Sequence, residues 1–138
     1  MAERPGLLDT GFVVALLNAS DPDHAACASV WNEWRAPLVT VEGVLVEAAH
    51  LLRRARGGTS ALLGLVAAAR VEIATPTPER YARATVLMAK YHDVPMDLVD
   101  ALLVALAEER GAHRALTLDR RGFETYRIGG RRRFAIVP

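Results

Sequence analysis

A chain of 138 residues is near the common size of one domain, so we expect residues 1–138 to form a single domain with its own core. Hydrophobic residues make up 51% and aromatic residues only 6%, which predicts an aliphatic core; the net charge of +1 favours no class of partner. The single cysteine excludes an internal disulfide and a cysteine-rich zinc site. No apolar run is long enough to span a membrane and no secretory signal is recognisable, so we expect a cytoplasmic protein.

Short apolar segments predict five strands. They are residues 7–8, 36–41, 71–76, 114–118 and 133–138, the last expected at an edge. Apolar spacing and capping residues predict six helices, at residues 12–18, 22–35, 42–56, 60–69, 78–91 and 97–110. Asp21 and Thr77 each precede a proline at the first helical position, and Thr59 or Ser60 is the expected cap of the fourth helix. The alternation of strands and helices predicts an α/β fold with a parallel sheet.

Two aspartates directly follow predicted strands. Asp9 begins the triplet Asp-Thr-Gly of aspartic proteases, but those enzymes are rich in strands and need two such triplets, whereas this chain is mostly helical. Asp9 and Asp119 instead lie where ligands bind in open parallel sheets, at the carboxyl ends of strands. Each could equally cap the helix or turn that follows it.

Two further acids interrupt apolar helix faces. Asp100 is the only polar residue in 98–107, and Glu47 lies in the apolar stripe between Val44 and Leu51. Burying a lone carboxylate is costly, so a functional site is the favoured interpretation of both acids. Asp97 lies three positions before Asp100 on the same helix face, but its place at the helix start favours an N-cap.

Converging carboxylates would repel one another unless a cation compensates them. Mg²⁺ and Mn²⁺ prefer oxygen ligands, and an all-carboxylate site with open water positions suits the hydrolysis of phosphodiesters. From residue 110 to the end the chain has eight arginines against two acids, which suits a polyanionic substrate. The alternative is an ordinary solvated, arginine-rich tail. The arginines expected to contact such a substrate are Arg120, Arg121, Arg131, Arg132 and Arg133.

Four segments in order resemble the PIN-domain ribonucleases, and within them the VapC-type toxins of toxin–antitoxin pairs. They are "LLDTGFVVALLN", "PLVTVEGVLVEAAHLLRR", "VPMDLVDALLVALAEERGA" and "ALTLDRRGF". The resemblance implies a three-layer α/β/α PIN fold around a parallel sheet of four to five short strands. It also implies a metal site formed by Asp9, Glu47, Asp100 and Asp119. Asp97 would be an additional ligand or the helix cap, and the hydroxyls of Thr10 and Thr117 would support the ligands.

The same resemblance implies an endoribonuclease that uses Mg²⁺ or Mn²⁺ to cut single-stranded or loop regions of structured RNA. It further implies a homodimer, and a cognate antitoxin protein that blocks the active-site groove and provides any contact with DNA. The alternative function is a catalytically inactive PIN-like module that binds RNA or protein. A receiver-like phosphate pocket is disfavoured, because no paired acid follows the first strand and no lysine follows the last.

Overall fold

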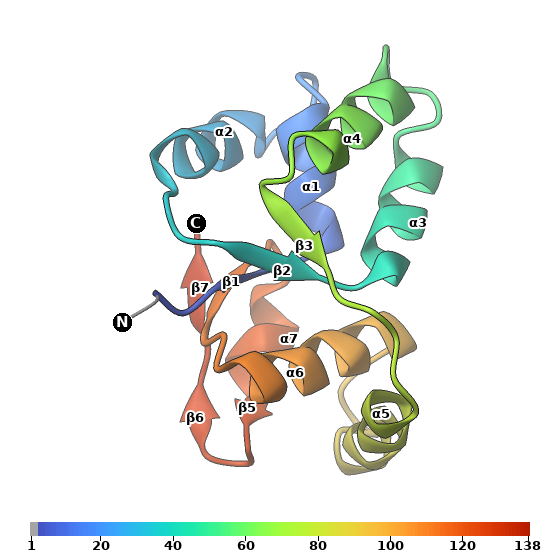
Figure 1. The fold of residues 1–138 in the computed structure, drawn as a ribbon, viewed down its shortest axis with the longest axis vertical. Coiled ribbons are helices and arrows are strands. Elements are labelled where there is room, and N and C mark those ends of the chain that lie inside the picture. The colour runs from blue at the N-terminus through green and yellow to red at the C-terminus, as the bar shows by residue number, and fades with distance from the viewer. Residues whose placement is uncertain (1–2) are drawn as a thin grey trace.

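The computed structural model describes residues 3–138, which form a five-stranded, wholly parallel sheet with helices on both faces (Figure 1). The strands run in the spatial order β3-β2-β1-β4-β7. Their bounds are β1 (Gly6–Leu8), β2 (Leu38–Thr40), β3 (Val71–Ile73), β4 (Arg114–Leu116) and β7 (Ala135–Val137). All five predicted strands are therefore present, and the last is at an edge as expected.

Helices cover the sheet in two layers, as Figure 1 shows. One layer holds α1 (Thr10–Leu17), α2 (His24–Glu33), α3 (Glu42–Leu51) and α4 (Gly58–Ala67). The other holds α5 (Pro78–Lys90), α6 (Leu98–Arg110) and the short α7 (Arg120–Thr125). The three-layer α/β/α architecture expected from the sequence is confirmed. Among residues 3–138, no helix combines the length and the apolar character needed to cross a membrane.

The strand order reverses between β1 and β4. The chain first adds β2 and β3 on one side of β1, then crosses back to place β4 on the other side. Leu8 at the end of β1 pairs with Leu116 at the end of β4, so the residues that follow the two strands are neighbours. Such a reversal opens a crevice at the carboxyl ends of the strands, which is where ligands bind in this class of sheet.

The core is aliphatic along the sheet and aromatic beside α7. Residues 101–107 of α6 are all buried, because this helix lies between the sheet and α5. Tyr91, Phe123, Tyr126 and Phe134 form edge-to-face pairs with ring centroids 5.2–5.4 Å apart. Composition alone did not reveal this aromatic cluster, because its few members are scattered along the chain and meet only after folding.

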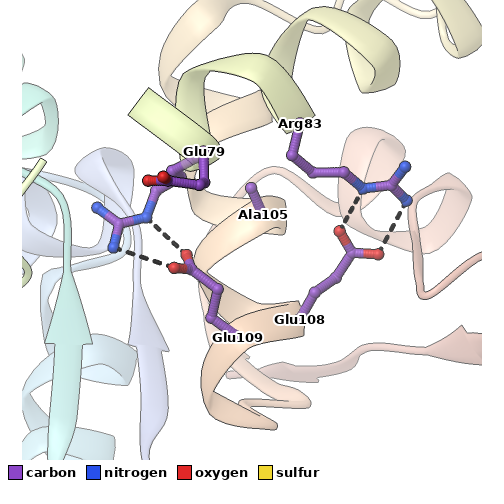
Figure 2. Close-up of a pocket in the computed structure, with 6 residues that line it drawn as sticks. Glu79, Arg83, Ala105, Glu108 and Glu109 are labelled. Atoms are coloured by element: carbon purple, nitrogen blue, oxygen red, sulfur yellow. Dashed lines mark hydrogen bonds and ion pairs between the residues drawn. The ribbon is translucent and has the colours of Figure 1, made fainter. Parts of the chain in front are cut away.

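Arginine–glutamate pairs join α5 to α6 around a cavity of about 330 Å³ (Figure 2). Arg80 Nε donates to Glu109 at 2.6 Å, and Arg83 Nε donates to Glu108 at 2.8 Å. Arg80 is only 6% exposed; Glu109 compensates its charge, and the carbonyl of Thr75 accepts a further hydrogen bond from its guanidinium. Since both α6 carboxylates are paired with arginines, we interpret this cavity as a gap in helix packing, separate from the candidate site below.

Several predicted helix boundaries are wrong, the first being the start of α1, which lies at Thr10 and not at residue 12. The second helix begins at His24 after Asp23, because the Asp21 carboxylate accepts a hydrogen bond from the Asp23 amide at 2.9 Å and forms a turn instead of a cap. α3 ends at Leu51, five residues before the predicted end. α4 begins at Gly58, after Gly57 in a left-handed conformation (φ 67°), so neither Thr59 nor Ser60 is its cap. The predicted cap of α5 is confirmed, since the Thr77 side chain accepts from the Arg80 amide.

The structure contains a two-stranded antiparallel hairpin that the sequence does not predict, formed by β5 (Arg127–Ile128) and β6 (Arg132–Arg133). Its strands are too short to show an alternation of apolar and polar residues. The usable signal was Gly129-Gly130, because both residues have positive φ (60° and 76°), the conformation that a tight hairpin turn requires.

Candidate functional site

Asp9 lies at the carboxyl end of β1 and is 8% exposed. Its Oδ1 accepts from the Thr10 amide at 2.8 Å, which makes it the N-cap of α1, and its Oδ2 accepts from the Thr117 hydroxyl at 2.6 Å. Burial raises the pKa of this carboxyl, against the two hydrogen bonds, and the charges of Asp119 and Asp97 raise it further. Asp9 is therefore both a cap and a buried acid, so the two interpretations are compatible.

Thr117 connects Asp9 with Asp119. Its hydroxyl donates to Asp9 and accepts from the Asp119 amide at 3.0 Å. The Asp119 carboxylate is exposed and accepts from the Gly122 amide at 3.1 Å, so it caps α7. A β-carbon at Gly122 would collide with that carboxylate, so a larger residue there would displace the Asp119 side chain. The two strand-end aspartates are thus held side by side at the point where the strand order reverses.

Glu47 reaches the same place from α3. The Thr10 hydroxyl donates to its Oε1 at 3.3 Å, and the side chain is half-buried. Burial raises the pKa of Glu47, and the charges of Asp97 and Asp9 raise it further. The same side chain lines a cavity of about 340 Å³ together with Val46, His50 and Leu51. Glu47 therefore connects the acidic cluster to an open, partly apolar hollow along α3.

Asp97 and Asp100 start α6 as a reciprocal pair. Asp97 accepts from the Asp100 amide at 2.9 Å, and Asp100 accepts from the Asp97 amide at 3.2 Å. The N-cap interpretation of Asp97 is confirmed. The sequence predicts Asp100 as an acid on an apolar helix face, but in the structure it lies in the first turn of α6 and has this capping role. Burial, and then the charges of Asp97, Asp9 and Asp119, raise the pKa of Asp100 to about 7.

The five acids thus lie within electrostatic range of one another at the carboxyl edge of the sheet. All the candidate ligand atoms are carboxylate oxygens, which suit a hard divalent cation. Burial, and then the mutual repulsion of the acids, raise the pKa values of Asp9, Glu47 and Asp100. Among residues 3–138, however, no three acidic, histidine or cysteine side chains are already arranged around one point that could hold an ion. Their chemistry fits such a cation, and binding it would require side-chain rotation.

The predicted RNA-contacting arginines lie in two places. Arg120 and Arg121 follow Asp119 directly on α7 and are exposed at the carboxyl edge. Arg131, Arg132 and Arg133 belong to the β5–β6 hairpin and lead into the start of β7. Because Ala135 pairs with Arg114 at the start of β4, the hairpin lies at the opposite, amino-terminal edge of the sheet. The five arginines therefore cannot form one continuous surface around the acids.

Tyr126 is a neighbour of the acids that was not predicted from the sequence. Its side chain is 1% exposed, and its pKa is raised by burial and then by the charges of Asp100, Asp119 and Asp97. Tyr126 follows Asp119 by seven residues, which is two helical turns. That spacing was the signal that could have placed a tyrosine hydroxyl on the acidic side of α7.

Comparison with known proteins agrees with this arrangement. The model of the PIN domain family matches residues 6–128. The chain is 31% identical over 134 residues to Ribonuclease VapC26 of Mycobacterium tuberculosis, covering 96% of this chain and 99% of that protein. The crystal structure of Mycobacterium tuberculosis VapC20, described as a sarcin–ricin loop cleaving toxin, has a TM-score of 0.74 and 26% identity over 84% of this chain and 91% of its own.

A toxin–antitoxin complex from Klebsiella pneumoniae contains a chain with a TM-score of 0.68 and 16% identity, covering 96% of both chains, which is a likeness of fold. The match to the family model spans most of the chain and includes Asp9, Glu47, Asp100 and Asp119. The sequence identity to Ribonuclease VapC26 over nearly its whole length supports the same family assignment. The chain belongs to the PIN domain family.

Proposed function

We propose that this protein is a divalent-metal-dependent endoribonuclease that acts as the toxin of a toxin–antitoxin pair. The observation that carries the proposal is the set of mutually repelling carboxylates at the reversal of strand order, in a chain similar to Ribonuclease VapC26 over 96% of its length. Neither part suffices alone, since a fold can host several activities and an acidic cluster can be structural.

Asp9, Glu47, Asp100 and Asp119 would hold Mg²⁺ or Mn²⁺, with Asp97 at the edge of the site as a further ligand or only as the cap. Such a cation supplies an activated water and compensates charge on the phosphate. Thr117 orients Asp9, and Thr10 orients Glu47, through the hydroxyl bonds described above. These hydroxyls limit the directions in which each carboxylate can point. This restriction suits a cation such as Mg²⁺, which requires a nearly octahedral arrangement of its ligands.

The substrate we propose is a single-stranded or loop region of a structured RNA. Arg120 and Arg121 lie next to Asp119, where an RNA backbone entering the site would pass. Arg120 also donates to the Pro138 carbonyl at 2.6 Å, which fixes part of its guanidinium. The similarity to a toxin described as cleaving the sarcin–ricin loop supports this class of substrate.

We also propose an antitoxin partner and a homodimer, on the strength of the family. The partly apolar hollow beside Glu47, with Val46 63% exposed and Leu51 57% exposed, is a surface that a protein segment could cover. Any contact with DNA would be made by the antitoxin. In the alternative function the chain binds RNA or protein without cleaving it, and the experiment below separates the two.

Cleavage of a loop-containing RNA should require a divalent cation. We expect cutting with Mg²⁺ or Mn²⁺, none after chelation with EDTA, and recovery when the cation is restored, because the carboxylates alone supply no positive charge to the phosphate. The products are resolved on a denaturing gel and end-mapped. Binding without cutting under every cation condition would favour the inactive module, and cutting that persists in EDTA would contradict the metal dependence.

Thr117→Val should lower the cleavage rate by about 10- to 100-fold, the usual effect of removing a group that orients a metal ligand. Valine has nearly the same shape, but it cannot donate to Asp9 or accept from the Asp119 amide. Thr85→Val is the matched control, because this threonine is exposed on α5 and donates to a helix carbonyl. Rates are compared at saturating cation. Equal rates in the two variants would show that Thr117 does not position the acids.

A further inference from the structure

A second group of arginines lies at the amino-terminal edge of the sheet, opposite the acids. It comprises residues from the N-terminal segment, the end of α2, the turn before β3, the start of β4 and the hairpin. These amino-edge arginines are Arg4, Arg35, Arg70, Arg114 and Arg132. All except the half-buried Arg114 are exposed. Folding thus gathers five cations from five separate segments onto one edge.

Contacts between the amino-edge arginines and two tryptophans make this group continuous. Arg114 donates to the Arg4 carbonyl at 3.0 Å, and its guanidinium lies over the Trp34 ring at 4.5 Å. Arg70 lies over the Trp31 ring at 4.2 Å and donates to the Trp34 carbonyl at 3.1 Å. Stacking on an indole restricts the guanidinium group while the N–H groups at its edge stay available. Less conformational entropy is therefore lost when these N–H groups bind a phosphate.

The hairpin brings Arg132 close to the other amino-edge arginines, near His113. The Ala135 amide, two residues after the hairpin, donates to the His113 carbonyl at 2.8 Å. The pKa of His113 is lowered by burial and then by the positive charges of Arg132, Arg114 and Arg4. The positive charges of three arginines from distant parts of the chain therefore lie close to the same histidine. The hairpin contributes its cation to the same surface as β4 and the N-terminal segment.

The positive charge of the surface is largely uncompensated. Among the ion pairs within residues 3–138, only one involves an amino-edge arginine, between Arg114 and Glu3 at 3.4 Å. The nearby Arg110 is paired with Glu72, so it contributes little to the field. A solvated ion pair at an exposed glutamate is weak, and a polyanion can displace it. Uncompensated arginines interleaved with aromatic rings are typical of a surface that binds nucleic-acid phosphates.

This surface is remote from the acids. α6 runs from Asp97 at the carboxyl edge to Gly111 at the amino-terminal edge, and its 13 residues span about 20 Å. A ligand that fills only the acidic site therefore does not reach the amino-edge arginines. Contact with both regions requires an extended polyanion.

We propose that the amino-edge arginines form a second RNA-binding surface, which holds the phosphates of a structured RNA about 20 Å from the acidic site. The inference rests on the proposed function only in naming RNA as the polyanion. Because the contacts go to phosphates, the surface adds affinity without reading sequence. It would favour long, folded RNAs over short single strands that carry the same cleavable loop.

The test compares RNA binding by two charge-matched double variants, both in an Asp9→Asn background so that the RNA stays intact. Arg4→Gln with Arg132→Gln removes two exposed amino-edge cations, and Arg53→Gln with Arg54→Gln removes two exposed cations after α3. The affinity for an RNA duplex that ends in a loop is measured by fluorescence anisotropy across a salt series. We expect the slope of log K against log salt, which is negative, to become less steep by about 2 in the first variant, one for each lost phosphate contact. The second should leave the slope unchanged.

Equal slopes in the two double variants would overturn the proposal. A changed sedimentation coefficient for the Arg4/Arg132 variant without a changed slope would also overturn it, and would make this edge a contact between copies of the chain. Thermal unfolding checks that both variants fold, which their exposed positions predict. Failure of the proposed function gives a different result. If the chain with Asp9 intact cuts no RNA but the two double variants still differ in slope, the ribonuclease activity is refuted and the second RNA-binding surface is retained.

Discussion

Asp9→Asn is expected to lower the rate of RNA cleavage by more than about 100-fold while the chain stays folded. Loss of a group that merely orients a ligand costs about 10- to 100-fold, so loss of a charged ligand should cost more. Asparagine keeps one oxygen that can accept from the Thr10 amide, and its amide group can donate to the Thr117 hydroxyl oxygen in place of the second carboxylate oxygen. It removes a charge whose burial is unfavourable, as the raised pKa of Asp9 shows, so the free energy of unfolding should be retained or increased.

The matched control is Asp93→Asn, which removes one exposed carboxylate before α6 and outside the cluster. Single-turnover cleavage of a labelled RNA gives the rate, and thermal unfolding gives the stability of each variant. A cleavage rate for Asp9→Asn within a few-fold of the control would remove Asp9 from the site. A loss of activity accompanied by unfolding would show only that Asp9 caps α1.

The second large effect expected is stabilisation by a divalent cation that grows with pH. Asp100 has its pKa raised from 3.8 to about 7, so between these values the folded state binds more protons than the unfolded state. Stability in EDTA should therefore fall as the pH rises through that window, because an acid with a raised pKa destabilises the fold once it ionises. A cation at about 100 times its Kd should add about 2.7 kcal/mol above the window, raising Tm by roughly 10 °C.

Calorimetric unfolding at several pH values, with EDTA or with Mn²⁺, measures this linkage. Other groups titrate in the same range, and Glu72, whose pKa is lowered by Arg110, acts in the opposite direction. The difference between the wild-type chain and Asp100→Asn isolates the contribution of Asp100, and the variant should show a flatter pH dependence in EDTA. Equal pH dependence of both chains in EDTA would contradict the raised pKa of Asp100. No shift of Tm with the cation at high pH would contradict the metal site.

Local signals in the sequence located most of the elements and the acids. Asp9 and Asp119 follow strands, and Glu47 interrupts an apolar stripe, so single-residue context was enough to select them. The apolar pattern around Asp100 indicated a functional acid but did not indicate that its carboxylate also accepts a capping hydrogen bond from the Asp97 amide. The β5–β6 hairpin was missed because strands of two residues carry no periodicity, and only its glycine pair could have indicated it.

The sequence by itself determined the alternation of strands and helices and the aliphatic core beside the sheet, and it selected the acids proposed for the site, since these depend on neighbours a few residues apart. Only the tertiary structure decided that Thr117 joins Asp9 to Asp119 and that the predicted RNA-contacting arginines divide between two edges of the sheet. Strand order and the direction in which the chain enters β7 are set by packing between distant segments. A run of arginines near the end of the chain therefore carries no information about which edge it reaches.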